Sequence, residues 1–277
     1  MIALREHASP NTRFTGKTDA IRSIIDIDGV CKTYDTASGE QVNALHDVNL
    51  HIGAGEFVCV VGASGCGKTT LLRLIAGLEK ITNGSIQVNG SQLAKPSRDV
   101  GVVFQDATLL PWRTILQNVL LPAAVLKLEP KTHDERARQL LGMVGLQDFL
   151  KKYPHELSGG MRQRAAIARS LVHDPAMLLM DEPFGALDAL TREQMNLDLL
   201  DIWNSTGKTI LLITHSISEA VFLADRVVVM SPRPGRVVDV IPIDLERPRR
   251  LEMINSERFG SYVRHIRSCL GGNGNGQ

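Results

Sequence analysis

One short glycine-rich segment restricts the fold of this chain more than any other feature of its sequence. Residues 62–69 read GASGCGKT and match the pattern G-x-x-x-x-G-K-[ST]. The apolar, β-branched run 57–61 precedes the segment and a helical stretch follows it, so it lies at a strand-to-helix turn. Glycines let the backbone wrap closely around phosphates, and the following helix presents its positive N-terminus to the same anion. The segment therefore predicts a nucleoside triphosphate site in a fold that combines strands and helices.

The side chains of this loop indicate how the phosphates are held. We expect Lys68 to bridge the β- and γ-phosphates and Thr69 to offer its hydroxyl to Mg²⁺. Cys66 is interpreted as a small residue at a variable position, and a reactive thiol is the alternative. The other residues of this segment that are expected to contact the nucleotide are Gly62, Ser64, Gly65, Cys66, Gly67 and Thr70.

Short apolar runs alternate with helical stretches through the middle of the chain. The runs are continuous rather than alternating, which is typical of parallel strands that are covered on both faces. We expect strands at 57–61, 100–104, 177–180, 210–214 and 227–230, and helices at 68–77, 133–144, 159–173, 190–206 and 217–224. This order predicts an α/β fold. The stretch from about 109 to 174 has helical segments and no clear strand, so we interpret it as a helical subdomain inserted into the sheet domain.

The two ends of the chain differ in composition from its middle. Residues 1–23 are polar and aperiodic and are expected to form a flexible N-terminal segment. The main domain is expected over 24–240. Residues 241–277 carry prolines, paired arginines and a short helix near 257–269, and they end in a stretch rich in Gly and Asn. We interpret this last part as a small C-terminal appendage with a disordered tail.

Two acids follow the predicted strand at 177–180. In sheets of this kind, ligands bind beyond the carboxyl ends of the strands, which is where Asp181 and Glu182 lie. Asp181 is placed to hold Mg²⁺, directly or through a water, and Glu182 is placed to polarise the attacking water. A solvated strand end without a catalytic role is the alternative.

Two further polar residues follow strands that are expected in the same sheet. His215 comes directly after the strand at 210–214 and is a candidate contact of the γ-phosphate, with a structural histidine as the alternative. Gln105 follows the strand at 100–104 and is a candidate contact of Mg²⁺ or of the attacking water.

A second anion site is predicted at the start of another helix. Residues 157–164 read LSGGMRQR, in which Ser158 is a good N-cap and Gly159 and Gly160 leave amide N–H groups exposed. Two phosphate sites in one chain are too many for one triphosphate. A head-to-tail dimer would explain the two sites, because each nucleotide would then lie between the loop of one copy and the helix cap of the other. An intramolecular site is the alternative.

Composition excludes several classes of partner. The 31 basic and 30 acidic residues leave a net charge of +1 and aromatic residues are 4% of the chain, so binding to nucleic acid is not expected. The four cysteines are far apart and form no C-x-x-C pattern, so the sequence suggests neither a disulfide framework nor a zinc site, and reduced thiols are expected. The N-terminal segment lacks the apolar core of a signal peptide, and no apolar run is long enough to span a membrane.

Taken together, the motifs resemble those of the nucleotide-binding subunits of ATP-binding cassette (ABC) transporters, over residues 24–248. They follow the order and spacing of that family: 62–69, Gln105, 157–163, 181–182, 186–188 and His215. The resemblance implies a P-loop NTPase ABC ATPase domain with a mainly parallel sheet core, an antiparallel β part near the N-terminus and an inserted helical subdomain. It also implies that Tyr34 stacks on adenine, with an ordinary partly buried strand tyrosine as the alternative. His215 is followed by Ser216, where the family often has Asp.

The same resemblance implies that the chain works in an assembly. Two such subunits close around two ATP molecules, Ser158 and Gly160 of one subunit touch the γ-phosphate bound by the other, and Asp188 couples the two sites. Closure acts on the subunits of a membrane permease, and the segment after Gln105 forms much of that contact. The protein is then expected to be peripheral, on the cytoplasmic face of the bacterial inner membrane.

Several segments are similar to those of importers of nitrate, sulfonates, taurine and bicarbonate. They are 109–114 (LLPWRT), 183–192 (PFGALDALTR), 232–236 (PRPGR), 241–245 (IPIDL) and 247–249 (RPR). Trp112 is interpreted as a permease contact, with an ordinary core or surface aromatic as the alternative. We therefore expect the ATP-hydrolysing subunit of a bacterial importer that is supplied by a periplasmic solute-binding protein. The alternatives are an exporter ATPase and a soluble ABC ATPase that acts on DNA or in translation.

Overall fold

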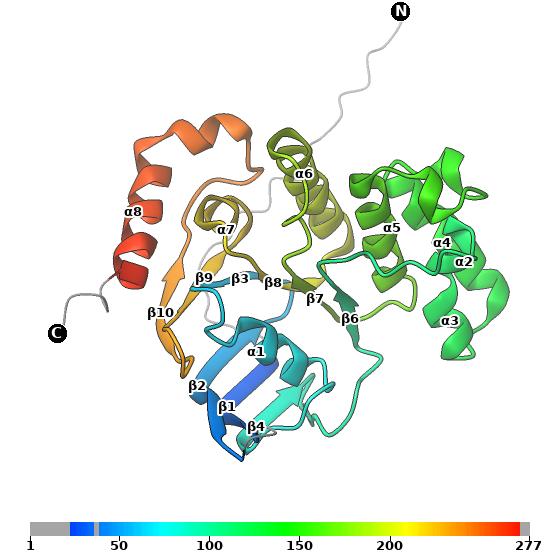
Figure 1. Ribbon diagram of the computed structural model, residues 1–277. Coiled ribbons are helices and arrows are strands. Elements are labelled where there is room, and N and C mark those ends of the chain that lie inside the picture. The colour runs from blue at the N-terminus through cyan, green and yellow to red at the C-terminus, as the bar shows by residue number, and fades with distance from the viewer. Residues whose placement is uncertain (1–22, 36–38, 272–277) are drawn as a thin grey trace, which may run out of the picture.

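The computed structural model describes residues 23–35 and 39–271 (Figure 1). Within them, helix α1 (Lys68–Ile75) packs against two β-sheets, and further helices cover the far face of the larger sheet. The N-terminal segment that was expected to be flexible lies outside the described residues up to position 22, and Ser23 begins the first strand. The tail that was expected to be disordered lies outside them from position 272.

The larger sheet has six strands in the order β10-β9-β3-β8-β7-β6. All its pairings are parallel except that of β10 with β9. The strands are β3 (Phe57–Gly62), β6 (Val100–Val103), β7 (Met177–Asp181), β8 (Thr209–Ile213), β9 (Arg226–Met230) and β10 (Val237–Pro242). The prediction of an α/β fold with a mainly parallel sheet is confirmed, and β10 is a strand that the apolar runs did not indicate.

The central strand β3 explains why continuous apolar runs predicted this sheet. Every residue of β3 is buried. Phe57, Cys59 and Val61 belong to the apolar core on one face of the sheet. Val58 and Val60 belong to the core on the other face. Because both faces need apolar side chains, the sequence does not alternate with polar residues.

A smaller antiparallel sheet lies below the larger one in Figure 1 and has the order β2-β1-β4-β5. Its strands are β1 (Ser23–Asp35), β2 (Gln41–Gly53), β4 (Asn83–Val88) and β5 (Ser91–Gln92). The sheet confirms the antiparallel β part that was expected near the N-terminus. Helix α1 lies against both sheets and buries Leu71, Leu72, Leu74 and Ile75 in the core that they share.

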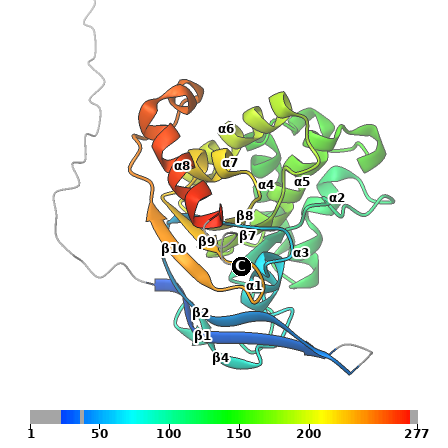
Figure 2. The ribbon, with the colours of Figure 1, turned by 60° about the vertical axis from the view of Figure 1, so that its left-hand side comes forward.

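Three helices cover the opposite face of the larger sheet (Figures 1 and 2). They are α6 (Ala189–Thr206), α7 (Ile217–Leu223) and α8 (Glu257–Gly271), and their buried apolar side chains belong to one core. In the C-terminal segment, the buried Arg249 donates to the carbonyl oxygens of Ala224 (3.1 Å) and Ile243 (3.4 Å). Phe259 and Ile266 of α8 are buried in the same core, so this segment packs directly on the sheet domain.

A cluster of helices lies at one side of the molecule, on the right in Figure 1. It consists of α2 (Ile115–Val119), α3 (Leu121–Val125), α4 (Pro130–Met143) and α5 (Gly159–Leu171). These helices lie within the interval 109–174, in which no named strand is found. The treatment of that interval as a separate subdomain stays a prediction. No helix in the described ranges is long and apolar enough to cross a membrane.

The loop before α2 is held by one buried amide. The side-chain oxygen of Asn118 accepts from the Leu110 N–H at 2.7 Å, and its amide donates to the Arg113 carbonyl oxygen at 3.0 Å. Asn118 is fully buried, whereas Trp112 at the tip of the loop is 71% exposed. The fold therefore presents the tryptophan outward on a fixed loop.

Candidate active site

The glycine-rich loop joins β3 to α1 as the sequence predicts. Gly65 and Gly67 have φ angles of +74° and +107°, a left-handed conformation that glycine adopts without steric cost. A Cβ atom on Gly67 would lie 2.7 Å from Leu45 Cδ2 and 2.9 Å from the Ala44 carbonyl oxygen. A larger residue would therefore push the loop away from β2.

Lys68, the first residue of α1, is buried and folds back over this loop. Its ammonium donates to the carbonyl oxygens of Gly62 at 2.9 Å and Ala63 at 3.0 Å. An ammonium has three N–H donors, so these contacts leave one for an oxygen of a bound anion.

Cys66 lies beneath the loop rather than in its concave side. The side chain is buried in the apolar core that contains α1. A Cβ atom on Gly62 would lie only 2.7 Å from Cys66 Sγ, so the thiol packs against the end of β3. This packing favours the interpretation of Cys66 as a small buried residue over that of a reactive thiol.

Thr69 and Asp181 come together although they lie far apart in the sequence. The Thr69 hydroxyl donates to Asp181 Oδ1 at 3.1 Å. Asp181 ends β7, and its burial is the largest cause of the raised pKa of its carboxyl group, while the Thr69 hydroxyl acts in the opposite direction. A hydroxyl and a carboxylate are the oxygen ligands that Mg²⁺ prefers, so this pair fits the expected ion.

Glu182 follows directly and turns the chain sharply at the end of β7. Its φ angle of +46° is uncommon for a residue other than glycine, and its N–H donates to the Ile213 carbonyl oxygen at 2.9 Å. Glu182 Oε2 lies 3.2 Å from His215 Nδ1. The neighbouring strands β7 and β8 thus bring the carboxylate and the imidazole together at one edge of the sheet.

A buried carboxyl group lies behind this pair and was not among the predicted site residues. Glu219 of α7 is 6% exposed and shares a small crevice with Glu182 and His215. Burial raises the pKa of the Glu219 carboxyl, and a hydrogen bond with the Thr214 side chain lowers it. The only sequence signal for it is an acid inside the mostly apolar run 217–223.

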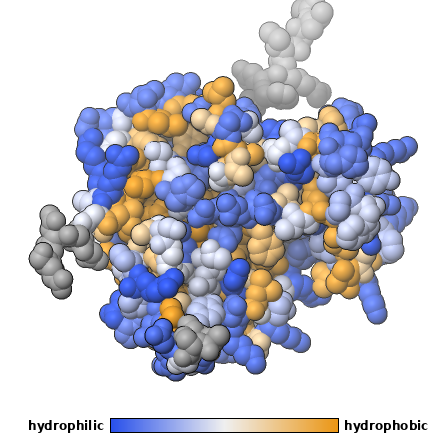
Figure 3. Space-filling view, viewed as in Figure 1, coloured by the Kyte–Doolittle hydropathy of each residue, from blue (hydrophilic) through white to orange (hydrophobic). Residues whose placement is uncertain are grey.

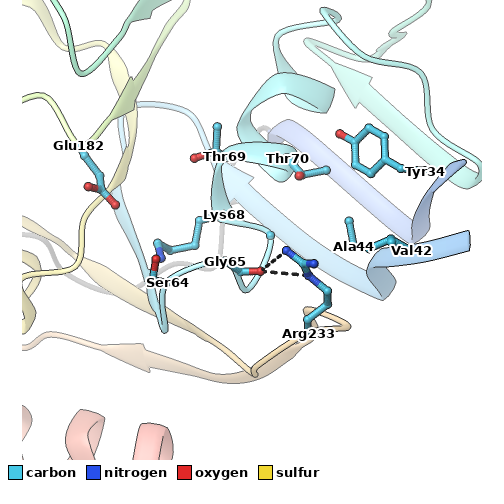
Figure 4. A pocket seen from close by; sticks show the side chains of 11 residues that line it. Tyr34, Val42, Ala44, Ser64, Gly65, Lys68, Thr69, Thr70, Glu182 and Arg233 are labelled. Atoms are coloured by element: carbon cyan, nitrogen blue, oxygen red, sulfur yellow. Dashed lines mark hydrogen bonds between the residues drawn. The ribbon is translucent and has the colours of Figure 1, made fainter. Parts of the chain in front are cut away.

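About half of the predicted site residues line one pocket of about 250 Å³ (Figure 4). The lining includes Ser64, Gly65, Gly67, Lys68, Thr69, Thr70 and Glu182. Tyr34 of β1 lies at the far side of the pocket in Figure 4, with the Lys32 ammonium 4.5 Å from its ring centroid. Val42 and Ala44 of β2 complete that side, and no sequence motif indicated them.

Arg233 also lines this pocket, although its motif gave it no role in the site. Its guanidinium donates to the Gly65 carbonyl oxygen from Nε at 3.3 Å and from Nη2 at 3.1 Å. The turn that carries it is fixed by Gly235, whose N–H donates to the Ala44 carbonyl oxygen at 2.9 Å and whose carbonyl oxygen accepts from the His46 N–H at 3.0 Å. Figure 4 shows the positive side chain between Gly65 and Ala44. The sequence signal for Arg233 is an arginine in a Pro-Gly turn. This signal indicates the turn but not the contact of Arg233 with Gly65.

Gln105 follows β6 and does not line this pocket. A Cβ atom on Gly185 would lie 3.6 Å from Gln105 Nε2 and 3.8 Å from Glu182 Oε2. The amide of Gln105 and the carboxylate of Glu182 therefore both border Gly185. The Gln163 amide of α5 donates to the Phe104 carbonyl oxygen at 3.2 Å, which ties α5 to the residue before Gln105.

The second predicted anion site lies outside the pocket. Ser158 is the N-cap of α5, and its hydroxyl accepts from the Met161 N–H at 3.3 Å. Gly159 and Gly160 open the helix. Neither they nor Ser158 line the pocket around Lys68. The single chain therefore presents the two predicted anion sites separately.

Two further positions from the sequence motifs are helix N-caps. The Asp188 carboxylate, at the start of α6, accepts from the Thr191 N–H at 3.0 Å and from its hydroxyl at 2.6 Å, and these hydrogen bonds lower the pKa of Asp188. A Cβ atom on Gly160 would lie 3.1 Å from Thr191 Cγ2, so the starts of α5 and α6 adjoin. Ser216, where the chain departs from the family pattern, caps α7 by accepting from the Glu219 N–H at 3.3 Å.

The fold and the site together define a class of protein. A parallel sheet with a glycine-rich loop between β3 and α1, two acids at the end of β7 and a separate glycine-led helix cap are the features of a P-loop NTPase of the ABC type. The model of the ABC transporter family matches residues 45–185. The chain belongs to the ABC transporter family, as a subunit that binds and hydrolyses ATP.

Similar proteins cover most of the chain. It is 47% identical over 250 residues to an uncharacterized ABC transporter ATP-binding protein of Methanocaldococcus jannaschii, covering 90% of this chain and 93% of that protein. It is 49% identical over 237 residues to the nitrate import ATP-binding protein NrtD of Synechocystis, covering 83% and 89%. It is 50% identical over 203 residues to the taurine import ATP-binding protein TauB of Escherichia coli O157:H7, covering 73% and 80%.

A solved structure extends the similarity to three dimensions. It is that of an ATP-binding cassette in a dimeric post-hydrolysis state bound to ADP and Pi. The TM-score is 0.70 at 34% sequence identity, and the match covers 80% of this chain and 100% of that chain.

Proposed function

We propose that the chain energises a bacterial importer of nitrate, a sulfonate, taurine or a similar small anion. The observation that carries this proposal is the similarity of most of the chain to ATP-binding proteins named for the import of nitrate and taurine. A bicarbonate transport ATP-binding protein of Synechocystis is 45% identical over 235 residues. Nitrate and bicarbonate are small oxyanions, and taurine carries a sulfonate, so the solutes named for these relatives share one chemistry.

In this proposal the chain is a peripheral subunit on the cytoplasmic face of the inner membrane. Permease subunits form the passage and a periplasmic solute-binding protein delivers the solute. The exposed Trp112, on its fixed loop, supports a contact with the permease. Val125 is 70% exposed and Met143 46% exposed in the same group of helices. Figure 3 has apolar patches over this side of the molecule, and exposed apolar surface of this kind marks interaction sites.

ATP binds in the pocket with its base toward Tyr34 and its γ-phosphate toward Glu182. The pocket is lined at one side by the tyrosine ring and at another by the acid, with the glycine-rich loop between them. The remaining N–H donor of Lys68 then reaches the β- and γ-phosphates, and the backbone around Gly65 and Gly67 surrounds them.

Thr69 and Asp181 would hold Mg²⁺, and Gln105, which follows β6, is a further candidate ligand. The ion, when bound, neutralises negative charge between the β- and γ-phosphates. The hydrogen bond of 3.1 Å between the Thr69 hydroxyl and Asp181 supports this assignment, because it already brings two oxygen ligands to one point.

Glu182 acts as the general base that polarises the attacking water. Its carboxylate lines the ATP pocket and lies 3.2 Å from His215 Nδ1. The imidazole orients the carboxylate at the end of β7 and also contacts the γ-phosphate. This arrangement is that of a base positioned by a second polar group.

The functional unit is a head-to-tail dimer. Ser158, Gly159 and Gly160 form an anion site at the start of α5 that does not line the pocket of their own chain. In the dimer they close the pocket of the partner chain, and Asp188 beside them couples the two sites. The dimeric state of the similar cassette bound to ADP and Pi supports this arrangement.

The test is the uptake of labelled nitrate, taurine and an alkanesulfonate by source cells that carry either the native chain or Lys68→Ala. We expect Lys68→Ala to lose ATP binding and to abolish the uptake of one of these solutes. Lys95→Ala, which removes an exposed lysine outside the pocket, serves as the control and is expected to support native uptake.

The result also separates the proposal from its alternatives. Native uptake of all three solutes by Lys68→Ala cells, in a strain without a second transporter for them, would overturn the importer assignment. Co-purification of the native chain with its permease, followed by identification of a solute-binding protein encoded with it, distinguishes an importer from an exporter.

A further inference from the structure

Three side chains that can ligate a transition metal converge between β10 and α8, outside the ATP pocket. Asp239 lies on β10, and His265 and Cys269 lie on α8. Residues four positions apart share one face of a helix, so the imidazole and the thiol are presented together. The Asp239 and His265 side chains are 39% and 54% exposed, so solvent ions reach them.

The distances between the three ligand atoms match those around a tetrahedral ion. His265 Nε2 lies 3.1 Å from Asp239 Oδ2, and Cys269 Sγ lies 3.8 Å from that oxygen and 4.0 Å from that nitrogen. Bonds to zinc of about 2.3 Å from sulfur and about 2.0–2.2 Å from nitrogen and oxygen separate tetrahedral ligands by about 3.3–3.6 Å. Each observed separation agrees with this range to within about half an ångström.

The donor set selects the class of ion. We propose that Asp239, His265 and Cys269 bind one zinc ion, or another divalent cation that favours sulfur and nitrogen, with water as the fourth ligand. Thiolate, imidazole and carboxylate are the ligands of zinc sites, and an open site has three protein ligands and one water. Mg²⁺ and Ca²⁺ take oxygen ligands, so neither matches the thiolate and the imidazole.

This proposal differs from what the cysteine spacing suggested. The absence of a C-x-x-C pattern gave no sign of zinc, because one ligand comes from a strand and two come from a helix much later in the chain. Over the described ranges, Asp239, His265 and Cys269 are the one group of three such residues whose ligand atoms lie within 4.8 Å of one another. Cys31 Sγ and His46 Nδ1 lie 3.7 Å apart but have no third such ligand beside them within these ranges. This cysteine–histidine pair therefore serves as a control for the proposed site.

Metal binding would fasten the C-terminal helix to the sheet. The ion displaces the thiol proton of Cys269, which passes to solvent, and forms a metal–sulfur bond in its place. The bond joins the last turns of α8 to β10, the edge strand of the larger sheet. An ion that binds only the folded chain also raises the temperature of unfolding.

The experiment is a titration of the full chain with Co²⁺ and Zn²⁺ after removal of bound metal, in excess Mg²⁺ so that the ATP site does not compete. We expect one Co²⁺ per chain, with the absorption band of a thiolate–cobalt bond that Zn²⁺ abolishes. Cys269→Ser should remove the band, and His265→Ala and Asp239→Asn should weaken binding by at least about 10-fold.

Cys31→Ser is the matched control and should keep native metal binding. The unfolding temperature without metal tests the fold of each variant, and the partly exposed positions of all three ligands make folded variants the expected result. No thiolate–cobalt band in the native chain, or a band that survives in Cys269→Ser, would overturn the proposal. The readouts involve neither ATP hydrolysis nor transport, so they do not depend on the proposed function.

Discussion

At the scale of single residues, Glu182 is the proposed general base, and its substitution tests whether ATP binding can be separated from hydrolysis. Glu182→Gln preserves the size of the side chain, but an amide cannot accept a proton from water. Loss of a general base costs about 10²- to 10⁴-fold in rate. We therefore expect Glu182→Gln to bind ATP with native affinity, to lower kcat at least about 100-fold and to accumulate as an ATP-bound dimer. Steady-state hydrolysis and calorimetric titration with ATP measure these quantities.

The control for this change is Glu135→Gln, which alters an exposed glutamate of α4 and is expected to hydrolyse ATP at the native rate. If Glu182→Gln kept native turnover, Glu182 would have no role as the base, and the 3.2 Å contact with His215 would be structural.

Arg233 adds a positive charge to the pocket wall, and its removal tests a contact that the motifs do not contain. Arg233→Ala should raise the KM for ATP about fivefold, since an exposed charge pair contributes up to ~1 kcal/mol. Because Arg233 hydrogen-bonds to Gly65 and not to Glu182, kcat should stay close to native. Arg236→Ala removes an exposed arginine of the same turn and should change neither constant. An equal rise in KM for both variants would contradict a specific contact by Arg233.

The positions of the candidate site residues were predictable where each residue belongs to a local motif. Lys68 and Thr69 follow from the loop and helix around them, and Asp181 from the strand that it ends. Arg233 was not predictable, because it is 168 residues away from Gly65, whose carbonyl oxygen it contacts. The group of Asp239, His265 and Cys269 was not predictable for the same reason, since only the packing of α8 on β10 brings these residues together.

At the scale of elements, strands were predictable where both faces are covered. Strands β3, β6, β7, β8 and β9 read as continuous apolar runs because helices or the second sheet pack on each side. Strand β1 mixes buried and exposed residues without strict alternation, and its pairing with β2 shifts register at several points. A pattern with period two is lost at each such shift, so only family resemblance indicated this sheet.

The turn between β9 and β10 packs so closely on the glycine-rich loop that one methyl group should disturb both. A Cβ atom on Gly235 would lie 2.1 Å from the Cys66 carbonyl oxygen. Overpacking of this kind costs about 1–3 kcal/mol. We expect Gly235→Ala to lower the midpoint of thermal unfolding by roughly 2–10 °C and to weaken ATP binding, because the loop must move.

Gly142→Ala provides the comparison for that change. Gly142 lies in α4, and a Cβ atom there would meet nothing within 4 Å. Alanine is favoured over glycine in helices by about 1 kcal/mol, so this variant should unfold at the native temperature or above it. A Gly235→Ala chain as stable as Gly142→Ala would show that the turn has room to move away from the loop.

At the scale of the whole molecule, the separation of the two predicted anion sites is the feature on which the proposed dimer rests. The pocket around Lys68 is lined by residues that we propose bind and hydrolyse ATP but by none of the residues at the start of α5. The start of α5 adjoins the start of α6, so Ser158 and Asp188 belong to one surface. One chain thus presents the pocket and the helix cap apart from each other, and in the proposed dimer each completes the complementary part of a second copy.

Ser158→Asp tests this assembly without disturbing the fold of one chain. Aspartate caps helices as well as serine does, so α5 should form normally. The added carboxylate would face the γ-phosphate of the partner's ATP, and repulsion between the two negative charges should prevent closure. In a Glu182→Gln background, we expect Ser158→Asp to bind ATP with native affinity as a monomer, measured by light scattering after gel filtration. Ser158→Thr keeps the cap without the charge and should still form the ATP-dependent dimer. A dimer of Ser158→Asp with ATP would mean that the cap does not contact the partner's nucleotide.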